Sequence, residues 1–152
     1  MREIQVVSAA NVPAVAAFDY VADFRNAGDW IMGLKSLEPV GSQVRGQGTV
    51  LEGVVKLGAT LKATLEFTEW DEGRMFAARA TKGFRVEATM TFTPTGPTTS
   101  TTTLDVRYEF GGGVAGKALE RLCEPPFALA AKHAEKNIRK HAEASYKSSK
   151  TA

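Results

Sequence analysis

The residues best suited to chemistry are few in this sequence, and their spacing does not assemble a catalytic or metal-binding set. His133 and His141 stand eight residues apart with no third metal ligand in view. Cys123 is the only cysteine, which excludes an intrachain disulfide and a cysteine metal cluster. The pair Gly46 and Gly48 lacks the strand-to-helix context of a nucleotide fingerprint. We therefore expect no metal and no cofactor.

Composition narrows the class of protein further. A length of 152 residues predicts one domain. The net charge of +2 is too small to indicate a nucleic-acid partner. No apolar run approaches the roughly 18 residues of a membrane span, and the N-terminal segment has no long apolar stretch typical of a signal peptide. We expect a cytoplasmic protein with no stable membrane insertion and no nucleic-acid partner; the sequence does not indicate its oligomeric state.

Strands must position any reactive side chains, because apolar and polar residues alternate with a period of two from residue 35 to residue 110. Short turns join successive strands, which predicts an antiparallel meander with one apolar and one polar face. An open Thr/Pro/Gly loop is expected over residues 94–100. A first strand is expected at 3–8, a helix at 13–22, and a short helix or turn within 23–30 that brings Trp30 to a buried place. The later strands are expected at 36–44, 49–57, 59–69, 74–81, 84–93 and 101–110.

A long helix near the C-terminus, residues 113 to 147, is expected to cover the apolar face of this sheet. Pro125 and Pro126 predict a break, giving helices at 114–124 and 126–146. Small residues such as Ala130 and Ala134 lie at the centre of its apolar stripe and would leave room beneath the helix. Basic residues gather at its end, and a solvated face is expected there, with a membrane surface or acidic partner as the alternative. These basic residues are Lys136, Arg139, Lys140 and Lys147.

The apolar face predicted for the strands carries one titratable group, the Tyr108 hydroxyl. Tyr108 is expected either to donate to a ligand or to pack in the core with its hydroxyl at the rim. No inward carboxylate pair or His–carboxylate set emerges, so general acid–base catalysis has no obvious residues. A lining without charge favours an apolar ligand, since a buried unpaired charge is costly.

Three segments resemble the START-like superfamily, in its polyketide cyclase/dehydrase and lipid-transport branch. They are FDYVADFRNAGDW at 18–30, LEFTEWDEGRMFAARA at 65–80, and the glycine-led segment GGGVAGKALERLCEPPF at 111–127. The resemblance covers nearly the whole chain. It implies an α+β helix-grip fold, in which a curved antiparallel sheet of about seven strands and two short N-terminal helices wrap around a long C-terminal helix.

The resemblance also bears on activity. In the aromatase/cyclases of this family, tryptophan, tyrosine and arginine side chains in the cavity are implicated in folding a poly-keto chain, and Trp30 matches the tryptophan position. Thr68 and Glu69 occupy the neighbourhood where the cavity arginine is expected, and alternation places Arg79 on the polar face. This departure weakens the case for cyclase activity.

We therefore expect residues 1–147 to form one START-like domain, with 148–152 as a disordered tail. Its expected function is to bind a hydrophobic small molecule (a lipid, polyketide or isoprenoid-like compound) between the sheet and the last helix. The alternative is a polyketide aromatase/cyclase or dehydratase that uses the same cavity. The residues expected to line the cavity are Trp30, Leu51, Val55, Leu65, Phe76, Met90, Phe92, Val106, Tyr108, Phe127, Ala130 and Ala134.

Overall fold

The protein is a single curled sheet that closes around one long helix, as shown by a computed structural model that describes residues 1–151. Seven antiparallel strands follow the order β1-β7-β6-β5-β4-β3-β2, so the first and last strands of the chain are neighbours. The strands are β1 (Arg2–Ala10), β2 (Leu34–Pro39), β3 (Val50–Leu57), β4 (Ala59–Asp71), β5 (Met75–Gly83), β6 (Arg85–Gly96) and β7 (Thr99–Glu109). The helices are α1 (Ala14–Ala22), the short 3-10 turn η1 (Phe24–Asn26), α2 (Ala27–Trp30) and α3 (Gly113–Thr151).

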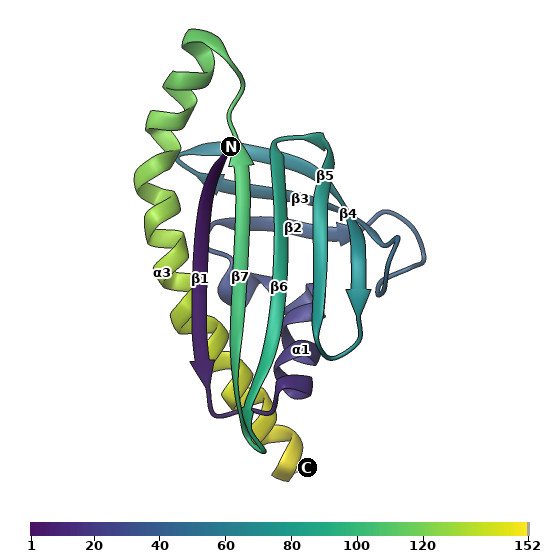
Figure 1. Ribbon diagram of the computed structural model, residues 1–152. Coiled ribbons are helices and arrows are strands. Elements are labelled where there is room, and N and C mark those ends of the chain that lie inside the picture. Colours follow the sequence, from purple (N-terminus) through teal and green to yellow (C-terminus); the bar gives the residue numbers. More distant parts are fainter. Residues whose placement is uncertain (152) are drawn as a thin grey trace.

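The curvature of the sheet creates the space that α3 covers. Strands β2 and β3 run across the molecule behind β1, β7 and β6, and α3 passes along the side of the sheet from one end to the other (Figure 1). The predicted alternation is present in β7, where Leu104 and Tyr108 are buried while Arg107 is exposed. The expected α+β helix-grip architecture is therefore confirmed.

The largest differences from the predicted strand boundaries lie at the end of β2 and at the turn between β6 and β7. β2 ends at Pro39 instead of residue 44. The residues beyond it form a loop that is held by hydrogen bonds within the loop and by one to β4. The Gly48 N–H donates to the Phe67 carbonyl at 2.8 Å, and the Gln43 side chain donates to the Arg45 and Gln47 carbonyls. The open loop expected over 94–100 is instead a tight hairpin, since β6 runs to Gly96 and β7 resumes at Thr99.

The break expected at Pro125 and Pro126 is wrong, because α3 is helical from Gly113 through Thr151. Pro126 cannot donate to the Leu122 carbonyl four residues earlier. That carbonyl instead faces the β3–β4 turn, so closely that a Cβ added to Gly58 would lie 2.3 Å from it. Gly58 adopts φ +80°, a conformation that favours glycine. Tertiary packing thus holds the helix together where the local rule predicts a break.

Polar contacts fix α3 against the strands along its length. Arg2 of β1 pairs with both Glu120 and Glu124. Ser8 is 1% exposed and donates to the Glu135 carbonyl at 2.8 Å. A disordered tail was expected at residues 148–152, but residues 148–151 continue the helix. Ala152 lies outside the described residues.

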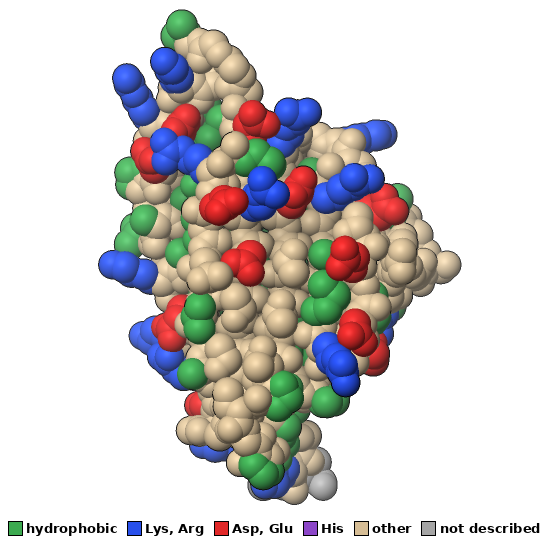
Figure 2. Space-filling view, in the orientation of Figure 1, with side chains coloured by type: hydrophobic (Ala, Val, Ile, Leu, Met, Phe, Trp, Pro, Cys, Tyr) green, Lys and Arg blue, Asp and Glu red, His purple; other side chains and the backbone are tan. Residues whose placement is uncertain are grey.

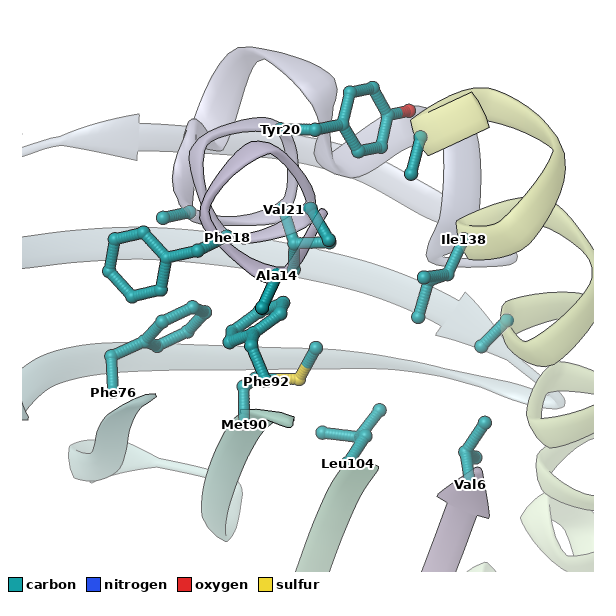
Figure 3. Close-up of a cluster of buried hydrophobic side chains, with 14 of the residues drawn as sticks. Val6, Ala14, Phe18, Tyr20, Val21, Phe76, Met90, Phe92, Leu104 and Ile138 are labelled. Carbon is teal, nitrogen blue, oxygen red and sulfur yellow. The ribbon is translucent and has the colours of Figure 1, made fainter. Parts of the chain in front are cut away.

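One half of the space inside the sheet is solid. Phe18 of α1 is fully buried and packs edge-on against the rings of Trp70, Phe76 and Phe92, at centroid distances of 5.3, 5.9 and 5.3 Å. Figure 3 shows Phe18, Phe76 and Phe92 converging between α1 and the strands, with Ile138 of α3 closing the side. α1 fills only this end of the space inside the sheet. The rest of that space lies between the sheet and α3.

Candidate functional site: an apolar cavity under the long helix

A partly open cavity of about 300 Å³ lies between α3, the segment around Trp30 and the inner face of the sheet. Its size is at the lower end of the range typical of small-molecule sites. Eight of the residues expected on the cavity lie on its lining. These are Trp30, Val55, Leu65, Val106, Tyr108, Phe127, Ala130 and Ala134.

The other four residues expected there, Leu51, Phe76, Met90 and Phe92, lie in the solid core instead, and each is 8% exposed or less. They do point to the inner side of the sheet, as their alternation predicts. However, the aromatic ring of Phe18 and its neighbours occupy that half of the interior. Alternation identifies the side of a sheet that is buried, but it does not show which part of that side another element fills.

The sequence prediction missed part of the wall. Leu57, Leu61 and Phe84 stand at positions that strand alternation assigns to the inner face, and all three line the cavity. The contributions of β1 and of the segment 31–37 were not foreseen, because that short segment shows no periodicity and β1 pairs with the distant β7. The remaining lining residues are Ile4, Val6, Ile31, Met32, Leu34, Leu37, Gly53, Leu57, Leu61, Ala63, Phe84, Val86, Ala88, Leu104 and Ala131.

Small side chains on α3 leave the space open, and aromatic rings bound one end of it. Ala130, Ala131 and Ala134 present only methyl groups to the cavity. One turn earlier, Phe127 packs against Tyr108 at a centroid distance of 4.9 Å and against Phe84 at 6.3 Å. The cavity is therefore bounded by aromatic rings at this end. Beside them, α3 contributes only small side chains to the lining.

Besides the Tyr108 hydroxyl, Trp30 brings a polar group to the lining of the site. Its indole Nε1 is buried, and among the side chains that the structure describes, those of residues 1–150, it is the only buried nitrogen or oxygen without a hydrogen-bond partner. An unsatisfied buried donor costs about 1–3 kcal/mol. Trp30 lies on the cavity lining, but its Nε1 exposes less than 1 Å², so a ligand acceptor would recover that free energy only if the indole turned toward it.

Polar side chains from three helices meet at α2, which carries Trp30. The Tyr20 hydroxyl of α1 donates to Asp29 of α2 at 2.6 Å, and His141 Nδ1 of α3 lies 4.0 Å from the same carboxylate. Burial and the hydrogen bond to Asp29 raise the pKa of Tyr20 above its ordinary value, so the phenol stays protonated and keeps donating. The Tyr20–Asp29 hydrogen bond therefore ties α2 to α1, next to His141 of α3.

The lining carries almost no ionisable chemistry. Tyr108 is its only ionisable residue, and burial raises the pKa of that hydroxyl. Arg79 is exposed, and its register neighbours on the adjacent strands are Glu66 and Glu87; it is not among the residues that line the cavity. No cluster of three metal-ligating side chains occurs in the described part of the chain, and none of the helices there is both long and apolar enough to cross a membrane.

The curled antiparallel sheet, its long helix and the apolar space between them define the helix-grip class of ligand-binding folds. The sequence profile described as "Polyketide cyclase / dehydrase and lipid transport" matches residues 1–143. The chain therefore belongs to this family, as the resemblance in its sequence indicated. Among curated protein sequences, none matches the chain significantly.

Solved structures show the same fold at low sequence identity. The protein TTHA0849 from Thermus thermophilus is 21% identical, with a TM-score of 0.77 over 94% of this chain and 98% of its own. The aromatase/cyclase Zhui from Streptomyces sp. R1128 is 16% identical, with a TM-score of 0.72 over 93% of both chains. A START superfamily protein from Mycobacterium smegmatis is 17% identical, with a TM-score of 0.69 over 91% of this chain and 97% of its own.

Proposed function

We propose that this domain binds a neutral, largely hydrocarbon small molecule, such as a lipid, polyketide or isoprenoid-like compound, in the cavity beneath α3. The observation that carries the proposal is the lining itself. It has about 300 Å³ of space, no charged side chain, and a single buried donor without a partner at Trp30.

The lack of charge determines which end of a ligand can lie inside. Neither Arg, Lys nor His is on the lining, so a carboxylate there would lose its hydration without gaining a counter-ion. A carbonyl or ether oxygen, in contrast, is a weakly hydrated acceptor that Trp30 Nε1 can satisfy once the indole turns toward it. We therefore propose a neutral ligand with an acceptor oxygen in preference to a free fatty acid.

An aromatase/cyclase or dehydratase is the alternative, and two solved structures with this fold are described as aromatase/cyclases. Such chemistry needs a positioned group that takes and returns protons. On this lining only Tyr108 is ionisable, and burial raises its pKa. This lining favours binding over catalysis.

The test uses three probes of similar shape: fluorene, fluorenone and fluorene-9-carboxylate. Their affinities are measured by isothermal titration calorimetry. We expect fluorenone to bind about twofold to twelvefold more tightly than fluorene, the worth of one hydrogen bond. The carboxylate should bind more weakly than either.

Variants assign the effect to one side chain. Trp30→Phe should remove the preference for the ketone. The matched control Trp70→Phe should keep it, because Trp70 packs in the solid core and its Nε1 donates to Glu72. Failure of all three probes to bind would overturn the proposed function, and tightest binding of the carboxylate would overturn the preference for a neutral ligand.

A further inference from the structure

The outer side of α3 combines exposed apolar and basic side chains, and neither set takes part in the fold. Three of its apolar residues are solvent-exposed: Val114 at 87%, Leu122 at 58% and Leu129 at 59%. Among them and beyond them lie five exposed basic residues, Lys117, Arg121, Lys132, Lys136 and Lys140. Lys132, Lys136 and Lys140 follow one another at intervals of four, so they lie along one face of the helix.

The positive charge of this side is not neutralised by the helix itself. Each of the five basic residues lacks an ion pair in the described part of the chain, whereas the acidic residues of α3 are engaged elsewhere. Glu120 and Glu124 pair with Arg2 of β1, Glu135 pairs with Arg139, and Glu143 accepts from the Asn11 backbone N–H at 2.7 Å. In the space-filling view, basic and hydrophobic side chains, with acidic ones among them, line the edge of the molecule formed by α3 (Figure 2).

We propose that the outer side of α3 docks onto the surface of an anionic lipid bilayer. Lysines near such a surface gain attraction from its negative potential, and exposed leucines between them can enter the boundary between headgroups and acyl chains. The stripe from Val114 to Leu129 extends about 22 Å along the helix at 1.5 Å per residue. A long, narrow stripe of this kind suits an extended surface better than the compact buried centre of a protein–protein interface.

The position of the stripe gives this docking a consequence for the cavity. Phe127, Ala130 and Ala134 face the cavity, while Leu129 and Lys132, in the same turns, face solvent. A docked domain would hold its apolar cavity one helix away from the bilayer. An apolar molecule exchanging between the two would then travel only a short distance through water.

The test is flotation of the full chain with vesicles, and it needs no cavity ligand. Vesicles of phosphatidylcholine alone are compared with vesicles containing about 30% phosphatidylglycerol, at about 0.05 M and 0.5 M NaCl, since salt screens the attraction. We expect binding to the anionic vesicles at low salt only. Lys132→Gln with Lys136→Gln should lower the partition coefficient about tenfold to thirtyfold, from about 1 kcal/mol per lysine.

Two further variants distinguish this face from net charge and from other partners. Lys62→Gln with Lys82→Gln, which removes equal charge from exposed positions on the sheet, should change the partition coefficient less than about twofold. Leu122→Ser with Leu129→Ser should lower it about tenfold through lost insertion. Equal loss in the sheet variant would overturn the proposal, as would full binding of the leucine variant. Binding to soluble polyglutamate without binding to vesicles would indicate an acidic protein partner instead and would also overturn it.

Discussion

Replacing Ala134 by phenylalanine distinguishes an open cavity from a filled core. Ala134 is 5% exposed and lies on the cavity lining. If the space beneath it is real, the new ring fills it, and the apolar area that it buries offsets the cost of fitting it. We expect the free energy of unfolding to change by less than about 1 kcal/mol, while the affinity for fluorenone falls below detection.

Ala142 provides the matched control on the same helix. It is 1% exposed and belongs to the solid core. A phenylalanine there has no space to enter, so Ala142→Phe should destabilise the protein by about 1–3 kcal/mol or more through overpacking. Urea unfolding followed by circular dichroism gives both values. Equal destabilisation at the two positions, or unchanged fluorenone affinity in Ala134→Phe, would refute the reasoning.

Two other predictions concern the contact between the β3–β4 turn and α3. Gly58→Ala should cost more unfolding free energy than Gly113→Ala, by at least about 1 kcal/mol: both glycines have positive φ, but only at Gly58 would a Cβ meet another backbone atom. Similar urea midpoints would contradict this. Burial raises the pKa of the Cys123 thiol, so the folded state keeps a proton that the unfolded chain releases at about pH 8.5, and stability should fall as pH rises through that range. The fall in urea midpoint from about pH 7.5 to 9.5 should be smaller in Cys123→Ala, and an identical fall in both proteins would contradict the assignment.

The order of elements and the inner face of the sheet could be predicted because both depend on local patterns. Alternation along β4, β6 and β7 places Leu65, Val86 and Val106 inside whichever strands they pair with. The same rule places Arg79 outside, where the structure has it. Alternation does not show whether an inward residue lies at the level of the cavity or at the level of the packed core. Phe92 and Val106 have equivalent alternation, yet only Val106 reaches the cavity, because Phe18 of α1 packs over Phe92.

The proline and Trp30 results show the other limit of local reasoning. A double proline predicts a break, but α3 continues through it, and the turn just before the prolines is held against the sheet by contacts with Arg2 and Gly58. For Trp30, the sequence predicted burial near the cavity but not the unpaired Nε1. A missing partner depends on every neighbour of the indole, including residues distant in sequence, so it is visible only in the folded structure.

The indole N–H resonance of Trp30 tests the central claim most directly. The chain has two tryptophans, so a proton–nitrogen correlation spectrum should show two indole peaks, and Trp30→Phe assigns them. Adding fluorenone should move the Trp30 proton downfield as its Nε1 begins to donate to the ketone, while fluorene should move it much less. The Trp70 peak, whose Nε1 already donates to Glu72, should stay in place. If saturating fluorenone leaves the Trp30 peak unmoved, or moves it no further than fluorene does, the account of this cavity as a site for neutral acceptor-bearing ligands is contradicted.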